Sequence, residues 1–494
     1  MYRSSSPATA PVPTVDAQHA KRWWALAVLS LTQLVVVLDG TIVNIALPQA
    51  QLELGLSDGQ RQWVVTAYAL AFGALLLLGG RIADYWGRKR TFMVGMLGFG
   101  AASVFGGVAQ SGMELIIARG LQGAFAALLA PAALALLTVT FTHGKERNTA
   151  FAIFGTVAGT GAAIGLLLGG VLTEFADWRW CLLVNVFFVL AGLIGGLLFV
   201  TESKAPGENR YDWAGAVTVT LGLGALVYGF TLAEHGWAEL DTIGFLALGV
   251  LLLAAFVVIE SRVAQPLLPL RVVLHRVRGG AYLIQAVIGS AMIGGTVYLA
   301  FHLQIVLGFS PLTAGVASLP MTVVIMFCVP FITKLLPVIG PRPMMIVGPL
   351  IAAVGLFWLS GITADGNYFT QVLPGLVILG VGMANLFVPV QNLALIGVAP
   401  EDAGAASAMA NSASQIGGSI GLAVFTALYS TAASAQAELD PTAPLAAFTA
   451  GYSVVFASAA VAMLAGAVIA AVFIRGRKEE LMPFGEASAA VHVG

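Results

Sequence analysis

Two charged residues stand inside long apolar stretches of this 494-residue chain, and their types suit proton chemistry. Asp39 lies in the stretch LDGTIVNIALP at 38–48, and Arg119 lies in a later apolar run. Counted from the outer ends of their two runs, the residues lie at similar depth. Burial in hydrocarbon favours the neutral form of a carboxylate, so Asp39 can serve as a proton carrier. Arg119 keeps its charge and needs a carboxylate, backbone carbonyls or a water-filled cavity beside it. The pair either couples protons to transport or is a static ion pair that joins two helices.

Uncharged polar residues recur in other apolar runs, where they could line a cavity and orient a substrate. The candidates are Asn44, Gln285, Tyr298, His302, Asn385, Gln391, Asn411 and Gln415. Hydrogen bonds between neighbouring helices explain such residues at least as often. Histidine side chains titrate in the range that a second proton site would need, so His302 is a candidate. Its expected position near the outer end of its apolar run argues against this role.

The segment GRIADYWGRKR at 80–90 places one acid among four cations, between two glycines. Asp84, near the end of one predicted helix, can pair with a cation at the start of the next. Such a contact holds one conformation and must break in the other. We therefore predict a gating loop, formed by Gly80, Asp84, Gly87, Arg88, Lys89 and Arg90. The alternative is a plain basic loop that only obeys the insertion rule.

Glycines in the run at 149–172 are spaced largely by four, as in Gly161, Gly165 and Gly169, with Gly170 adjacent. This spacing lines small residues on one helix face and lets another helix approach closely. Tight static packing uses the same pattern, so the glycines by themselves do not indicate motion.

The composition shows the environment in which these residues are held. The chain is 59% apolar and 10% charged, against roughly 25% charged residues in soluble domains, and its mean hydropathy is +0.92. It is an integral membrane protein. A formal net charge of -1 argues against capture of nucleic acid. The two cysteines, Cys181 and Cys328, lie in apolar stretches and predict neither a disulfide framework nor a metal cluster.

A hydrocarbon core of ~30 Å takes about 20 apolar residues to span, and the chain divides into fourteen such runs. The predicted spans are 23–48, 62–82, 91–110, 113–139, 149–172, 179–200, 212–233, 242–261, 279–307, 312–335, 343–362, 370–397, 404–431 and 447–474. With both termini in the cytoplasm, nearly all loop cations fall on the cytoplasmic side, and Arg61 and Arg179 are the exceptions. This bias is what the positive-inside rule predicts for a correct even count.

A faint internal repeat indicates two halves. GRKR followed by TFMVG at 87–95 returns as GPRP followed by MMIVG at 340–348. We predict a disordered cytoplasmic tail at 1–20, a six-helix bundle at 21–203, two extra helices with a basic linker at 204–278, a second six-helix bundle at 279–475, and a cytoplasmic tail at 476–494. The linker predicts either an amphipathic segment with its cations toward headgroups or a plain basic loop.

Four of these segments together resemble the motifs of the major facilitator superfamily, and in particular its fourteen-spanner drug:proton antiporter group. They are the first-run stretch at 38–48, the loop at 80–90, RGLQG at 119–123, and GAAIGLLLGG at 161–170, which is followed by DWRW at 177–180 and Asn185. The resemblance implies an all-α fold of two six-helix bundles plus two central helices. It implies a proton-transfer role for Arg119, with Gln122 and Gly123 in the same motif, and an antiporter role for the glycines at 161–170.

The resemblance implies a proton-coupled exporter of small amphiphilic compounds such as drugs and antibiotics, working by alternating access as a monomer in the cell membrane. It implies no enzymatic activity, cofactor or metal; the expected partners are substrate, protons and membrane lipids. An exporter or flippase of a lipid or endogenous metabolite would share every motif, and a non-transporting receptor is a further alternative. Relatives of cationic-drug type carry extra carboxylates in later helices, and none occurs in the last five predicted spans, which favours neutral, anionic or singly charged substrates.

Overall fold

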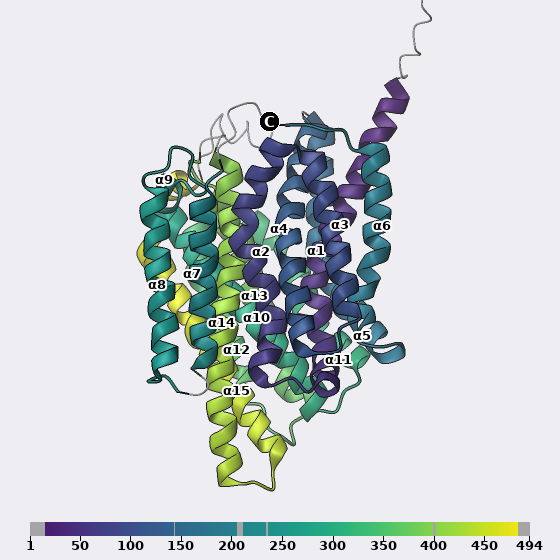
Figure 1. The fold of residues 1–494 in the computed structure, drawn as a ribbon. Helices are drawn as coiled ribbons and strands as arrows, with labels where there is room; N and C mark the ends of the chain where they lie inside the picture. The colour runs from purple at the N-terminus through teal and green to yellow at the C-terminus, as the bar shows by residue number, and fades with distance from the viewer. Residues whose placement is uncertain (1–14, 143, 205–210, 234–235, 399–401, 483–494) are drawn as a thin grey trace, which may run out of the picture.

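The computed structural model describes residues 15–142, 144–204, 211–233, 236–398 and 402–482. These residues form a bundle of long helices with no strand among them (Figure 1). The first six long helices, here called the N-half, are α1 (Val15–Leu54), α2 (Asp58–Trp86), α3 (Arg88–Gly107), α4 (Gly112–Thr140), α5 (Gly144–Phe175) and α6 (Trp180–Phe199). The C-half contains α10 (Arg276–Phe301), α11 (Pro311–Ile339), α12 (Pro341–Leu359), α13 (Leu373–Ala394), α14 (Ala403–Leu439) and α15 (Pro444–Phe473).

Between the halves run α7 (Trp213–Leu232) and α8 (Leu240–Glu260), and the short helix α9 (Leu270–Val273) leads into α10. Single π-helical turns, η1 (His302–Val306) and η2 (Tyr368–Val372), follow α10 and precede α13, and α16 (Lys478–Leu481) follows α15. We call the end of the bundle where α1 begins and α15 ends the termini end, and the opposite end, where α1 meets α2, the far end.

Each of the fourteen predicted spans corresponds to one long helix in the described residues. Thirteen of these helices are long and apolar enough to cross a membrane. The helix that falls short is α3, whose first turn holds Arg88, Lys89 and Arg90 and which is rich in glycine. The all-α membrane fold is confirmed, whereas the count of fourteen spans stays a prediction.

Some helices extend beyond the predicted spans. Helix α1 begins at Val15, so the last six residues of the predicted disordered tail at 1–20 are helical. Helix α14 runs on to Leu439, because the alanine-rich sequence after residue 431 favours helix without needing burial. With α15 it projects beyond the other helices at the far end (Figure 1). Residues 1–14, 205–210 and 483–494 of the predicted tails and linker lie outside the described residues.

Local signals set the helix ends. Ser57 caps α2 in a reciprocal capping box with Gln60, and Ser111 accepts a hydrogen bond from the backbone of Glu114 at the start of α4. Gly87 separates α2 from α3 with a φ of 127°, and Gly340 separates α11 from α12 with a φ of 85°. Both backbone conformations favour glycine. The two glycines occupy equivalent places in the predicted repeat.

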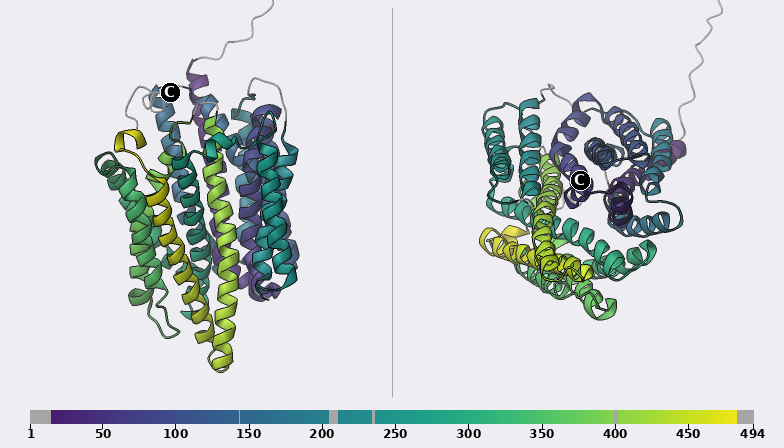
Figure 2. Two further views of the ribbon diagram at one scale, coloured as in Figure 1. Left: turned by 90° about the vertical axis from the view of Figure 1, so that its left-hand side faces the viewer. Right: turned by 60° about the horizontal axis from the view of Figure 1, so that its bottom comes forward.

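The extra helices α7 and α8 pack on each other at the side of the bundle and contact both halves (Figure 2). Helix α7 lies against α2, where Gln62 Nε2 donates to Thr231 Oγ1 over 3.2 Å. It also lies against α14 through an apolar cluster that includes Leu70, Val227 and Ala423. The pair therefore bridges the halves along the α2–α14 seam.

The basic linker before α10 bonds to the protein itself. Arg271 forms a two-pronged ion pair with Asp402 at 2.9 and 3.0 Å. Arg278 is buried and donates to the carbonyls of Val272, Ile396 and Arg271. These two cations fasten the linker to the C-half, while the two readings of the linker, an amphipathic segment at the headgroups or a plain basic loop, stay predictions.

The glycines of α5 form the predicted close-packed face. Gly161, Gly165 and Gly169 lie against α1. A Cβ at Gly165 would come 3.0 Å from the carbonyl oxygen of Leu38 and would clash with Thr41 Oγ1, which is itself hydrogen-bonded to Leu38. Gly170 faces a different neighbour, because a Cβ there would come 2.8 Å from Leu312 Cα in α11. The packing role of this face is thus visible, while its role in antiport stays a prediction.

We expect Gly165→Ala to lower the thermal unfolding temperature of the purified protein, because overpacking against backbone costs about 1–3 kcal/mol. The matched control is Gly159→Ala on the same helix, where a Cβ would meet no atom within 4 Å. Intrinsic tryptophan fluorescence during heating in detergent measures both variants. Equal unfolding temperatures for the two variants would contradict the close α1–α5 contact.

Candidate functional site

Asp39 and Arg119 form a fully buried ion pair in the N-half. Asp39 in α1 is 0% exposed and Arg119 in α4 is 1% exposed. Arg119 Nη1 donates to Asp39 Oδ2 over 2.6 Å. The similar depths predicted for the two residues therefore bring them into direct contact, although they lie 80 positions apart in sequence.

Arg119 has three further partners, so it does not depend on the carboxylate alone. Its Nε donates to the carbonyl oxygen of Val64 over 3.1 Å, and its Nη1 also donates to Gln122 Oε1 over 2.8 Å. The guanidinium lies 4.4 Å from the centre of the Tyr68 ring, at cation–π distance. If Asp39 takes up a proton, the guanidinium keeps two carbonyl acceptors and an aromatic face.

Two amides complete the surroundings of the carboxylate. Gln122 Nε2 and Asn185 Nδ2 donate to Asp39 Oδ1 over 3.0 and 2.7 Å, and Gln122 Nε2 also reaches Ser103 Oγ over 2.8 Å. We call Asp39, Ser103, Arg119, Gln122 and Asn185 the carboxylate cluster. All five are at most 1% exposed. Three donors stabilise the ionised carboxylate, and a change of its charge would alter contacts to both α4 and α6.

Sequence reasoning found Asp39, Arg119 and Gln122 but assigned no role to Asn185 and did not identify Ser103. A serine or an asparagine in an apolar helix gives no sign of which partner it faces. Gly123, also in the fourth-run motif, packs directly on the backbone of Tyr68 and lets α2 and α4 approach closely enough for Arg119 to reach Val64.

The predicted gating loop lies at the termini end between α2 and α3. Asp84 pairs with Arg88, the first residue of α3, at 2.8 and 3.1 Å, as the loop sequence suggests. The carboxylate of Glu202, which follows α6, accepts from the backbone N–H groups of Lys89 and Arg90. Lys89 Nζ donates to the carbonyl oxygens of Leu197 and Val200. The loop thus ties α2, α3 and α6 together inside the N-half, with Gly80 alongside Pro131 of α4; its gating role stays a prediction.

The eight residues predicted to line a substrate cavity differ widely in burial. Tyr298 and His302 are buried near the far end of the C-half, and His302 has no hydrogen-bond partner among the described residues. Asn44 is buried where α1 crosses α10 and donates to Thr296 Oγ1 over 3.4 Å. The remaining five range from buried to exposed: Gln285 is buried, Asn385 and Gln415 are half-buried, and Gln391 and Asn411 are exposed.

Their role as a cavity lining stays a prediction, because the periodicity of a span gives the depth of a residue but not the side of the helix that faces the centre when the helix is apolar all round.

Arg61 is a functional candidate that sequence reasoning missed. It lies in the second turn of α2 at the far end and is 3% exposed. Its guanidinium carbon sits 4.5 Å from the Phe301 ring centre, 5.1 Å from that of Tyr429 and 5.5 Å from that of Tyr298. We call Tyr298, Phe301 and Tyr429 the aromatic cage. The advance signal was that Arg61 is one of two loop cations on the predicted outer side.

The contact between Arg61 and the cage joins the N-half to the C-half, and other contacts at the same end do likewise. Gln304 Nε2 donates to the carbonyl oxygen of Ile45 over 2.9 Å, and the backbone N–H of Leu312 donates to Glu174 Oε2 over 2.9 Å. Among hydrogen bonds between described residues, those that link the two halves directly lie in the far-end part of the bundle. The far end is therefore held closed between the halves.

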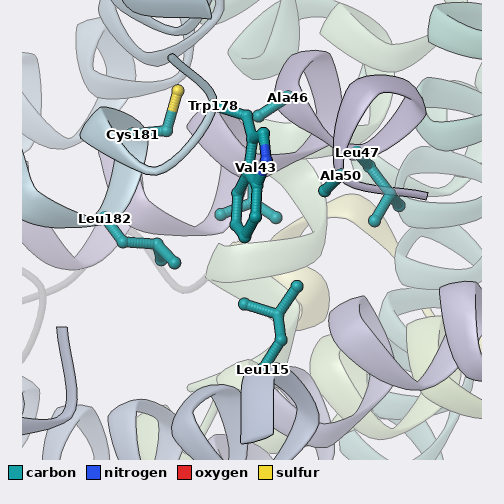
Figure 3. Close-up of a pocket in the computed structure, with 8 residues that line it drawn as sticks. All are labelled: Val43, Ala46, Leu47, Ala50, Leu115, Trp178, Cys181 and Leu182. Atoms are coloured by element: carbon teal, nitrogen blue, oxygen red, sulfur yellow. The ribbon is translucent and has the colours of Figure 1, made fainter. Parts of the chain in front are cut away.

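Two hollows among the described residues do not combine the polar groups and enclosure of a substrate pocket. One is an apolar void of about 10 Å³ beside α1, where Leu115 and Leu182 lie around Trp178 (Figure 3). At that size it has room for about one water molecule. The other, of about 500 Å³, is an open hollow on the surface of a single helix, between Asn148 and Val157 of α5.

Comparison with known proteins decides the family. A sequence model described as the Major Facilitator Superfamily matches residues 29–422. The chain belongs to this superfamily. It is accordingly a multi-pass membrane transporter of small molecules and not an enzyme.

Curated relatives of this superfamily match over nearly the whole chain. The puromycin resistance protein of Streptomyces alboniger is 44% identical over 99% of both chains. The cephamycin export protein of Amycolatopsis lactamdurans is 38% identical over 90% of this chain and 91% of its own. Among solved structures, a bacterial homolog of the human lysosomal transporter Spinster aligns with a TM-score of 0.64 and 18% identity, over 93% of this chain and 98% of that one. This likeness concerns the fold alone.

We expect Arg61→Gln to open the far end of this transporter. A desolvated cation–π contact is worth about 2 kcal/mol, so its loss should raise the population with separated halves by roughly tenfold or more. Spin labels on cysteines at Leu52 and Leu439, two exposed far-end residues of α1 and α14, report the distance in a background without Cys181 and Cys328. A longer-distance population should appear.

The matched control is Arg179→Gln. Arg179 is also a far-end cation, but it pairs with Glu53 at 2.6 Å inside the N-half and so does not join the halves. If both variants give the same distance distribution, the aromatic cage does not hold the far end closed.

Proposed function

We propose that this transporter exports small amphiphilic compounds, such as antibiotics and other drugs, in exchange for protons. The carboxylate cluster is the observation that carries the proposal. A carboxylate inside a membrane-spanning helix is costly, and functional sites are where such groups occur. The names of the relatives support the export direction, because they describe resistance to puromycin and export of cephamycin.

The charge distribution supports a cytoplasmic position for the termini end. Arg81, Arg88, Lys89, Arg90 and Arg278 all lie at this end in helix ends or loops, as the positive-inside rule requires of a cytoplasmic face. In this orientation the far end faces outward, both termini lie in the cytoplasm, and the protein works in the cell membrane as a monomer surrounded by lipid.

In this mechanism the described arrangement is the outward-closed one. Arg61 in the aromatic cage seals the outer side, and the ionised Asp39 is held by Arg119, Gln122 and Asn185. When the outer side opens, Asp39 takes up a proton and its ion pair weakens. After the halves rock back, the proton is released to the cytoplasm and substrate is accepted. Proton and substrate drive the cycle only if they favour different states.

The C-half supports a substrate without two positive charges. Helices α10 to α15 contain one acidic residue among their described positions, Glu438, which lies in the last turn of α14. A dication would need compensating carboxylates in the low dielectric of the span. Neutral, anionic or singly charged amphiphiles fit this lining better.

We expect Asp39→Asn to lower proton-driven efflux of a dye or antibiotic from reconstituted vesicles by about tenfold or more, because the amide cannot carry the proton. Counterflow of substrate without a proton gradient should persist. The control is Asp241→Asn, at an exposed acid in the first turn of α8, which should behave as the parent protein. Undiminished proton-driven efflux in the Asp39 variant would refute the assignment of the proton site.

A further inference from the structure

Asn185 has an unusual position among the groups that hold Asp39. It lies in α6, is 0% exposed, and its Nδ2 donates to Asp39 Oδ1 over 2.7 Å. Its other end, Oδ1, is buried and has no hydrogen-bond partner among the described residues. A buried acceptor without a partner is rare and calls for an explanation. Here it lies on the same side chain that contacts the carboxylate.

The other two partners of Asp39 cannot change their role. Arg119 has only donors. The carbonyl of Gln122 is already held by Arg119 Nη1 at 2.8 Å, so Gln122 must turn its amino group toward Asp39 and Ser103. Asp39 Oδ1 therefore faces two donors, which suits an ionised carboxylate and leaves a protonated one without an acceptor.

A half-turn of the Asn185 amide would remove this conflict. It would replace the Nδ2 donor with the Oδ1 acceptor at the position facing Asp39 Oδ1, and the O–H of a protonated carboxyl could then donate to it. The proton comes from bulk water and forms an O–H bond at Oδ1, while Arg119 keeps its charge and its other partners. The unpaired acceptor of one state becomes the paired acceptor of the other.

Building on the proton-carrier function proposed for Asp39, we propose that Asn185 is a positioning residue that donates to the ionised Asp39 and, after rotation of its amide, accepts from the protonated Asp39. This gives both protonation states a satisfied carboxyl group. It also makes α6 an element that responds to proton uptake, because the reversed amide presents different groups to its neighbours.

The other titratable groups around Asp39 cannot change from donating a hydrogen bond to the carboxylate to accepting one from the carboxyl group. Arg119 faces it from α4, Tyr68 from α2 and Cys181 from α6. The Tyr68 hydroxyl already donates to the carbonyl oxygen of Val36 over 2.9 Å, and Cys181 contacts Thr173. Helix α5 meets this part of α1 with Gly161 and Gly165, and α10 meets α1 through Thr296, so neither brings a charge.

Infrared difference spectroscopy of the full-length protein in lipid, between high and low pH, tests the exchange directly. With asparagine carbonyls labelled by carbon-13, we expect a shifted side-chain amide band that titrates together with the carboxyl band of Asp39. Asn185→Gln keeps the amide but removes its label, so the labelled band should vanish while the carboxyl band remains. A carboxyl band that titrates without any labelled amide change overturns the role of Asn185.

The same spectra separate this inference from the proton-carrier function. If the parent protein shows no titrating carboxyl band that Asp39→Asn removes, the carrier function itself fails. Transport provides a second readout. Asn185→Gln should keep proton-driven efflux within about twofold of the parent, whereas the apolar Asn185→Leu should lower it by about tenfold with counterflow retained. Equal coupling in the Leu and Gln variants also overturns the proposal.

Discussion

The buried positive charge of Arg119, inside a membrane-spanning helix, is the constraint on which the packing of the N-half depends. A guanidinium group has only donors, so the burial of Arg119 is tolerable only where acceptors surround it. The structure supplies them from α1, α2 and α4, with Tyr68 beneath the guanidinium. The tight α2–α4 contact at Gly123 follows from the same need, since it lets Arg119 reach the backbone of α2.

Depth and spacing along the chain were predictable because the membrane imposes them. A helix needs about 20 apolar residues to cross the membrane, so the spans could be located. Counting residues from the predicted outer face placed Asp39 and Arg119 at a similar depth. The Gly161, Gly165 and Gly169 spacing likewise predicted a close-packed face, because four residues make about one turn. The pairing of Asp84 with Arg88 followed from their positions on either side of a glycine turn.

The sequence did not predict which side of each helix faces which neighbouring helix. In a soluble protein, a stripe of apolar residues marks the side of a helix that faces the core. A membrane-spanning helix is apolar on all sides and gives no such mark. Ser103 and Arg61 were thus not expected in any site, and both are buried. The partners of Asn185 and the aromatic cage depend on contacts between helices distant in sequence, which no local pattern encodes.

The side-on position of α7 and α8 makes the two sides of the transporter unequal toward lipid. The hairpin covers the α2–α14 seam, with Val227 and Thr231 packed against it, whereas the seam between α5 and α11 carries no such cover among the described helices. In a bilayer, lipid would therefore contact the α5–α11 seam directly, whereas the hairpin stands between lipid and the α2–α14 seam.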